Sequence, residues 1–113
     1  MVIHDLRDFM VHSQTSLSKK IVLDKPDVLC FVLNLMPGQT IPEHGHEHST
    51  LVATVLQGSA RFRVNGQDKE LSALQTLIVE GADAFGIAQV HEKLSLHVTL
   101  SPNPSNPIFA KPI

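Results

Sequence analysis

Three of the seven histidines in this sequence fall within five residues, in the run His44-Gly45-His46-Glu47-His48. Alternate side chains of an extended segment share a face, so His44, His46 and His48 can point the same way. Neutral imidazoles gathered on one face are suitable ligands for Zn, Fe, Mn, Ni or Cu. A run of this kind is also typical of a solvated polar loop, and the residues themselves leave both interpretations open.

Other kinds of chemistry have little support in the sequence. Cys30 is the only cysteine and alternates with apolar neighbours, which favours a small buried side chain over a reactive thiol. The sequence has no G-x-S-x-G motif and no glycine-rich phosphate loop. Tyrosine is absent, so tyrosine acid–base chemistry is excluded.

Composition predicts an ordinary globular protein that binds neither nucleic acid nor membrane. The 113 residues are 42% hydrophobic and 18% charged, with a net charge of −2, so no basic face is expected. No apolar stretch approaches the roughly 20 residues that span a bilayer. The N-terminus does not have the pattern of a signal peptide. We therefore expect a cytoplasmic protein.

The hydrophobic pattern has a period of two residues, which is typical of strands. Turn signals such as Asn65-Gly66 separate short apolar runs, and no helix of ten or more residues is expected. Strands are predicted at about 17–23, 28–35, 51–56 (ended by Gln57-Gly58), 60–64, 76–79 and 94–100. The predicted fold class is all-β, a sandwich or closed barrel.

One domain is predicted for residues 1–113, with a barrel core at about 17–100 and a proline-rich tail at 101–113. Strand 28–35 is apolar on both faces, so both should be covered. The prolines of the tail cannot join a central strand, so the tail should run extended over the surface. Ile108 and Phe109 are expected to dock there onto the barrel or onto a second subunit.

The spacing around the histidines resembles the first motif of the cupin family. Gly38 is followed by five residues, then His44-x-His46, four residues, position 51, six residues and Gly58. The resemblance covers roughly residues 28–100. It implies a cupin-type double-stranded β-helix, the jelly-roll barrel of small RmlC-like cupins. It also implies a homodimer.

The sequence departs from the cupin pattern at two of the four ligand positions. Leu51 stands where the family has its glutamate ligand. A weaker second motif spans residues 71–89, and there Phe85 stands where the family has its third histidine. Gln89 lies near the family's usual asparagine. Two imidazoles alone would leave a divalent ion mostly coordinated by water, and Phe85 could fill the space of the metal.

A third ligand could come from one of several residues. His48 is the least remote, which makes His44, His46 and His48 the predicted metal set. The other candidates are His91, His97, Glu43, Glu47 and Glu80. His91 is interpreted instead as a turn residue, and His97 as a packed or hydrogen-bonded strand residue.

Three functions remain open. The favoured one is a module that binds a small molecule in an aliphatic barrel pocket through His44, His46 and Gln89, with a degenerate metal site. The second is a metal-dependent cupin enzyme of the dioxygenase or isomerase type. The third is a non-catalytic structural or regulatory barrel. The sequence leaves open whether the protein is an enzyme. It also leaves open whether the protein has no cofactor or binds a divalent transition metal.

Overall fold

The computed structural model describes residues 1–105, which form an all-β fold as predicted. All its strand pairs are antiparallel. In chain order the elements of this part are the 3-10 helix η1 (Leu6–Phe9) and the strands β1 (Ser18–Lys25), β2 (Val28–Leu35), β3 (Ile41–His44), β4 (Thr50–Val64), β5 (Gln67–Ser72), β6 (Thr76–Glu80) and β7 (Phe85–Ser101). No helix within it has the length and apolar composition to span a bilayer.

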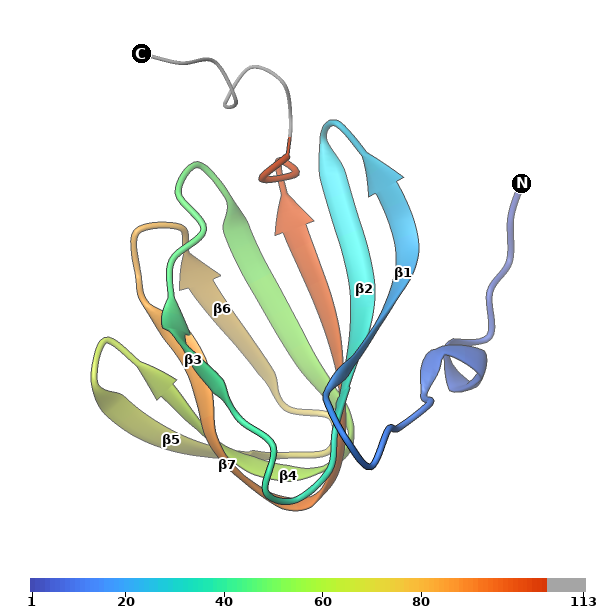
Figure 1. The fold of residues 1–113 in the computed structure, drawn as a ribbon. Coiled ribbons are helices and arrows are strands. Elements are labelled where there is room, and N and C mark those ends of the chain that lie inside the picture. The colour runs from blue at the N-terminus through green and yellow to red at the C-terminus, as the bar shows by residue number, and fades with distance from the viewer. Residues whose placement is uncertain (106–113) are drawn as a thin grey trace.

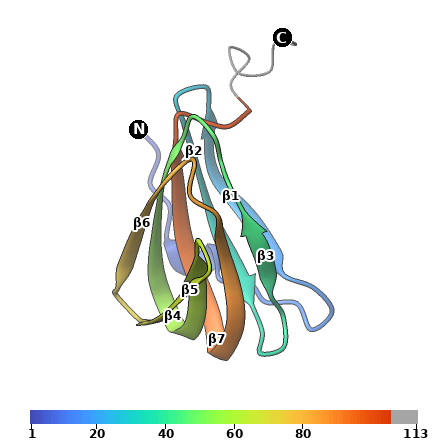
Figure 2. The same ribbon diagram turned by 90° about the vertical axis from the view of Figure 1, so that its left-hand side faces the viewer.

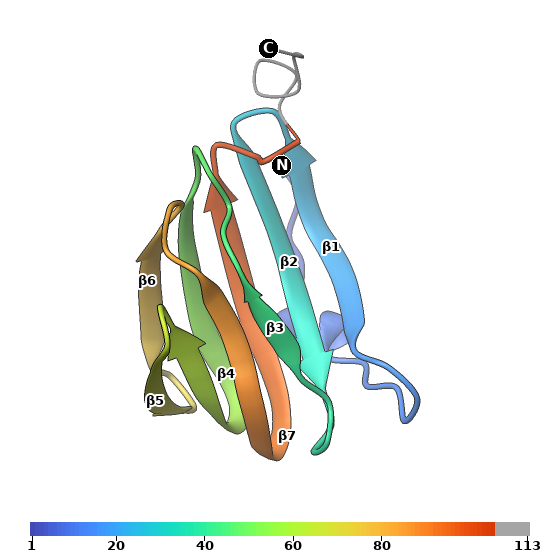
Figure 3. The same ribbon diagram turned by 60° about the vertical axis from the view of Figure 1, so that its left-hand side comes forward.

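The strands form two layers because β4 and β7 are long and bend (Figure 1). In the first layer, the first half of β4 pairs with the second half of β7. Here β2 lies beside β7, β6 lies beside β4, and β1 extends the layer at the edge of β2. The other halves pair with β3 and β5 in the second layer (Figure 3). Figure 2 shows the layers edge-on. The same two strands therefore support both sides of the barrel.

The bend of β4 corrects one sequence-based prediction. The turn signal Gln57-Gly58 was expected to end a strand, yet β4 continues through it to Val64. Register shifts on both sides of Gln57 absorb the bend, and Gly58 has a φ of 86°. A Cβ built at Gly58 would lie 2.0 Å from the carbonyl oxygen of Lys93 on β7. Glycine is needed because the two bent backbones approach here, so the expected turn is a bend within one strand.

The space between the layers is filled by one apolar cluster. Paired positions such as Leu33 and Leu96 point inward from β2 and β7, and Phe62 comes from the second layer. The outer side of β2 is covered as well, because the N-terminal segment packs there: the Asn34 amide donates to the Phe9 carbonyl at 2.8 Å. The prediction that both faces of this strand are covered is confirmed.

Sequence reasoning missed β3, β5 and the first half of β7, which it began at Leu94 rather than Phe85. The start of the tail is anchored, since Asn103 is 4% exposed and its amide donates to Asp24 and to the Lys25 carbonyl. The predicted docking of Ile108 and Phe109 lies outside the described residues.

Candidate functional site

A β-bulge in β3 decides which way its side chains face. Ile41 pairs with Ile87, and His44 pairs with Phe85, so β3 advances three positions while β7 advances two. The extra residue turns both Pro42 and Glu43 to the outer side of the layer. Paired residues share a side, and Phe85 is a core residue. His44 is therefore placed on the inner side, at the rim of the barrel.

His44 and His46 lie side by side at this rim. Their ring centroids are 4.6 Å apart at an interplanar angle of 62°. His44 Nδ1 lies 2.9 Å from the Pro42 carbonyl oxygen, which can only accept, so Nδ1 carries the hydrogen. The neutral ring then has Nε2 as an acceptor. Burial, the neighbouring His44 and the charge of Lys19 lower the pKa of His46, in that order, so His46 is neutral at neutral pH.

Gly81, which follows β6, holds the loop that carries His46. The backbone N–H of His46 donates to the Gly81 carbonyl at 2.9 Å, and the N–H of Ser49 donates to the His46 carbonyl at 3.0 Å. A Cβ at Gly81 would lie 2.3 Å from the His46 carbonyl oxygen and 2.6 Å from that of Ser49. This close approach fixes the backbone of His46, and therefore the position from which its side chain extends.

Beneath the rim, the two missing ligands are replaced by packed side chains. Leu51 and Phe85 are each 3% exposed and belong to the core cluster. Phe85 stacks on Phe62 with ring centroids 6.0 Å apart. These two positions offer a metal no donor atom, and the barrel interior beside them is apolar.

The structure does not gather a third ligand from the predicted candidates. Within residues 1–105 no group of three or more His, Cys, Asp or Glu side chains is arranged to hold a metal. His48 occupies a turn at φ 73°. The ring of His91 bonds Glu70, and His97 lies on the outer side of the first layer, paired with Val32 and Thr54. Two neutral nitrogens without a carboxylate do not fit the metal that the family implies.

Two of the remaining candidate carboxylates have other partners. Glu43 accepts a hydrogen bond from the Gly66 backbone N–H at 3.1 Å, across the outer side of β7. Glu80 accepts one from the Thr50 hydroxyl at 3.0 Å. Glu47 is exposed and lies outside any ligand group of the described chain.

Lys19 is a rim residue that sequence reasoning missed. It pairs with Leu33 and so faces the inner side of β1, where its ammonium lies 4.4 Å from the centroid of the Phe31 ring. Its positive charge is the third cause, after burial and the neighbouring His44, that lowers the pKa of His46. The spacing of Lys19 and Ile21, which places both on one face of a strand, was the available signal, but only the register of β1 with β2 shows that this face is inner.

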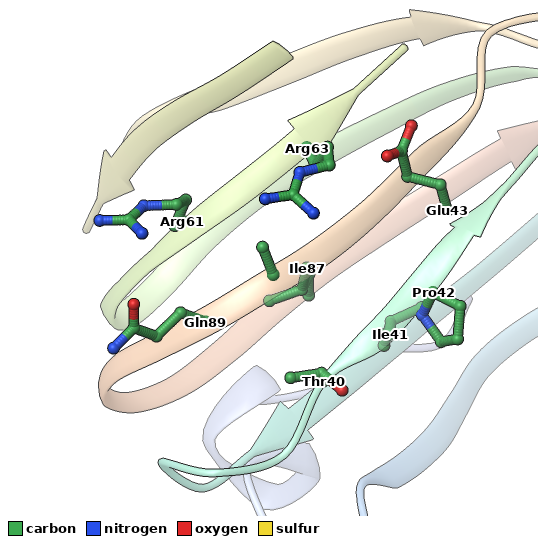
Figure 4. A pocket seen from close by; sticks show the side chains of 9 residues that line it. Thr40, Ile41, Pro42, Glu43, Arg61, Arg63, Ile87 and Gln89 are labelled. Atoms are coloured by element: carbon green, nitrogen blue, oxygen red, sulfur yellow. The ribbon is translucent and has the colours of Figure 1, made fainter. Parts of the chain in front are cut away.

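Gln89, the third predicted ligand-binding residue, is placed elsewhere. It pairs with Arg61, and the next pair joins Phe62 to Ile87, so Ala88 is an extra residue in β7. This second bulge turns Gln89 to the outer side, away from the histidines. There it lines a pocket of about 320 Å³ between β3, β7 and β4 (Figure 4). The structure brings His44 and His46 together and separates Gln89 from them.

Comparisons with known proteins agree with this architecture. A family model described as a cupin domain matches residues 31–100. No curated protein matches the chain. An uncharacterised Klebsiella pneumoniae protein with a double-stranded β-helix domain is 24% identical, with a TM-score of 0.81, covering 88% of this chain and 89% of that one.

Two further solved structures are similar. An RmlC-like cupin from Desulfovibrio desulfuricans is 19% identical, with a TM-score of 0.81, over 90% of this chain and 97% of that one. A protein from Thermus thermophilus is 24% identical, with a TM-score of 0.82, over 90% and 98%. At these identities the likeness carries the fold alone, and it confirms the predicted double-stranded β-helix.

Proposed function

This chain belongs to the cupin family, whose domain model matches it over residues 31–100, and on that premise we propose that it binds a small organic acid at the barrel rim without a metal. The observation that supports the proposal is the pair of adjacent imidazoles, His44 and His46, at a rim that also carries the Lys19 ammonium. Nothing in the described donor set favours metal chemistry over this.

The polar groups of the rim select the head of the ligand. His44 Nε2 is an acceptor, because Nδ1 donates to Pro42, so it favours a hydroxyl donor. Lys19 is the cation of the site and favours a carboxylate. A hydroxyl beside a carboxylate satisfies both, as in a 2-hydroxy acid.

The apolar side of the rim selects the body of the ligand. Ile21 follows Lys19 on the same inner side of β1 and is 45% exposed, which is high for a large apolar side chain. It pairs with Phe31. The most exposed members of the core, at 6–9%, are the inner residues Leu29, Phe31 and Leu33 of β2. A short alkyl chain laid along these residues would remove apolar surface from water.

The proposal is tested with 2-hydroxyhexanoate as the probe, by NMR titration of ¹⁵N-labelled, tag-free protein treated with a chelator. We expect saturable shifts at the backbone amides of residues 44–49. Hexanoate, which lacks the hydroxyl, and 2-hydroxyhexanamide, which lacks the carboxylate, should both bind more weakly. Lys19→Met should weaken binding of 2-hydroxyhexanoate about tenfold, the usual effect of removing one charged hydrogen-bond partner.

Lys20→Met is the matched control, because Lys20 pairs with Val32 and faces the outer side of the same strand. It should bind the probe as the unaltered protein does. Equal losses in the two variants, or shifts that miss residues 44–49, would refute the proposed site. Metal content measured on the tag-free protein before the chelator treatment addresses the enzyme alternative, and a stoichiometric transition metal that survives purification would favour it.

A further inference from the structure

We propose that the outer pocket between β3, β7 and β4 is a second binding site, for a small zwitterion whose cationic and anionic ends are separated by an apolar spacer. Its volume of about 320 Å³ falls at the lower end of the range of small-ligand pockets, roughly 300–1,000 Å³. It lies on the opposite side of the layer from His44 and His46, so its occupant is independent of the rim ligand.

The pocket is built by the two β-bulges. The extra residue in β3 puts Pro42 and Glu43 together on the outer side, and the extra residue in β7 does the same for Ala88 and Gln89. Gly86 keeps the strands close, since a Cβ there would lie 2.6 Å from the Ile41 carbonyl oxygen. Bulges of this kind re-aim side chains next to functional sites.

The charged groups are divided between the two ends of the pocket. Figure 4 shows Arg61 and Gln89 at one end and Glu43 at the other, with the Arg63 guanidinium between them. The apolar surface between the ends comes from Pro42 of β3 and Ala88 of β7. A ligand lying along the pocket therefore meets different charges at its two ends.

The Arg61 end suits a carboxylate. Arg61 uses only its Nε to bond Glu70, at 2.8 Å, so within residues 1–105 the N–H groups of its two terminal nitrogens have no protein partner. These groups form a planar edge that matches a carboxylate. The Gln89 side chain adds an amide donor at the same end.

The Glu43 end suits a cation. One Glu43 oxygen accepts from the Gly66 N–H, while the other has no partner in the described chain. The neighbouring Arg63 is engaged by Asp68 through two hydrogen bonds, at 2.7 and 3.3 Å. Asp68 supplies the hydrogen bonds that compensate this guanidinium, and Glu43 acts on Arg63 only more weakly, through its charge, so a Glu43 oxygen is left to accept from an ammonium.

The charge balance argues against a simple polyanion. Arg61 and Arg63 contribute two positive charges, and Glu43, Asp68 and Glu70 contribute three negative ones. Phosphate would meet this surplus of negative charge, whereas a zwitterion adds no net charge and pairs with both ends.

The test uses 6-aminohexanoate as the probe, with hexanoate and n-hexylamine as its one-charge counterparts, titrated into the full chain carrying Lys19→Met. The amides of Thr40, Ala88 and Gln89 report on the pocket. We expect 6-aminohexanoate to bind about tenfold more tightly than either counterpart, as one added charged contact provides.

Two variants separate the two ends. Arg61→Gln should weaken both 6-aminohexanoate and hexanoate, whereas Glu43→Gln should weaken only 6-aminohexanoate, so that its advantage over hexanoate disappears. Glu43→Gln keeps an oxygen for the Gly66 bond, and its spectrum checks the fold. Glu92→Gln, on β7 outside the pocket, is the control and should change neither affinity.

Three results would overturn the proposal. The first is that hexanoate binds the unaltered pocket as tightly as 6-aminohexanoate does. The second is that Glu43→Gln keeps the full preference for the zwitterion. The third is that the three reporter amides show no saturable shift at millimolar probe.

Discussion

The rim of the barrel and the outer pocket are built from the same strands, β3 and β7, and differ in almost every other respect. The rim has two adjacent imidazoles above the packed side chains of Leu51 and Phe85. The pocket on the other side has paired and half-paired charges over a small apolar lining. A single extra residue in each strand separates the two environments, because it decides which neighbours turn outward.

This difference indicates that the packed interior stabilises the fold, whereas the exposed charges of the outer pocket contribute mainly to recognition. The inner side, below the histidines, is occupied by core residues that are at most a few per cent exposed. On the outer side the arginine side chains are about 40% exposed, and exposed ion pairs contribute little to folding. Substitutions of the buried core residues should therefore change the free energy of unfolding, whereas substitutions of the exposed charges of the outer pocket should change binding there.

The largest effect is expected at Phe85. Phe85→Ala would leave a cavity beside Phe62 and should lower the free energy of unfolding by about 3–5 kcal/mol, as for other buried phenylalanines. Urea denaturation measures the loss. A loss below about 1 kcal/mol would mean that the former ligand position is not part of the packed interior.

A smaller effect, on both regions at once, is expected at Gly86. In Gly86→Ala the new Cβ would meet the Ile41 carbonyl oxygen at 2.6 Å and the Glu43 nitrogen at 2.8 Å, which pushes β3 away from β7. We expect a cost of about 1–3 kcal/mol, as for other overpacked sites. Amide shifts should spread to both His44 and Gln89. Shifts confined to one side of the layer would show that the rim and the pocket are not structurally linked through β3 and β7.

His97 extends the comparison to the outer side of the first layer, which is partly covered. Burial lowers the pKa of His97 below 6.5, the usual value for histidine. Its neighbours by register, Val32 and Thr54, carry no charge. As the pH falls, the unfolded chain therefore binds a proton at His97 before the folded chain does. The free energy of unfolding is unaffected by this histidine above pH 6.5 and decreases as the pH falls below it.

His97→Gln should remove this part of the acid sensitivity. The measurement is the urea midpoint between pH 8 and pH 5, compared with a His4→Gln control in the exposed N-terminal segment. The urea midpoint should change less with pH for His97→Gln than for the unaltered protein or His4→Gln. Parallel curves for all three proteins would show that burial of His97 does not contribute.

The smallest effect on stability is expected at Arg61. Its ion pair with Glu70 is exposed, so Arg61→Gln should leave the urea midpoint unchanged within error. The same variant is expected to lose affinity for carboxylates in the outer pocket. A clear fall of the midpoint would contradict the conclusion that the packed interior, and not the exposed ion pairs, stabilises the fold.

The sequence was informative where its alternation is regular. Strand 28–35 and the coverage of both its faces follow from its apolar pattern with a period of two, and the family pattern around His44 and His46 predicted the barrel. The apolar character of Leu51 and Phe85 already argued against two of the family's ligands. The predicted homodimer and the cytoplasmic location stay predictions.

The bulges are where sequence reasoning went wrong. Gln89 was grouped with the histidines because it lies near the family's usual asparagine, but the extra residue Ala88 interrupts the period of two and turns Gln89 to the outer side. Pro42 and Glu43 concealed β3 in the same way. Lys19 could be assigned to the inner side only after the register of β1 with β2 was known.

The most direct test of the central claim is the affinity of the rim for 2-hydroxyhexanoate with and without metal. The probe is titrated into chelator-treated protein and again after incubation with Zn²⁺ or Fe²⁺, while the amides of residues 44–49 are followed by NMR. The account predicts one affinity in all samples, because the imidazoles and Lys19 bind the acid themselves. Binding that appears only after a metal is added would contradict it.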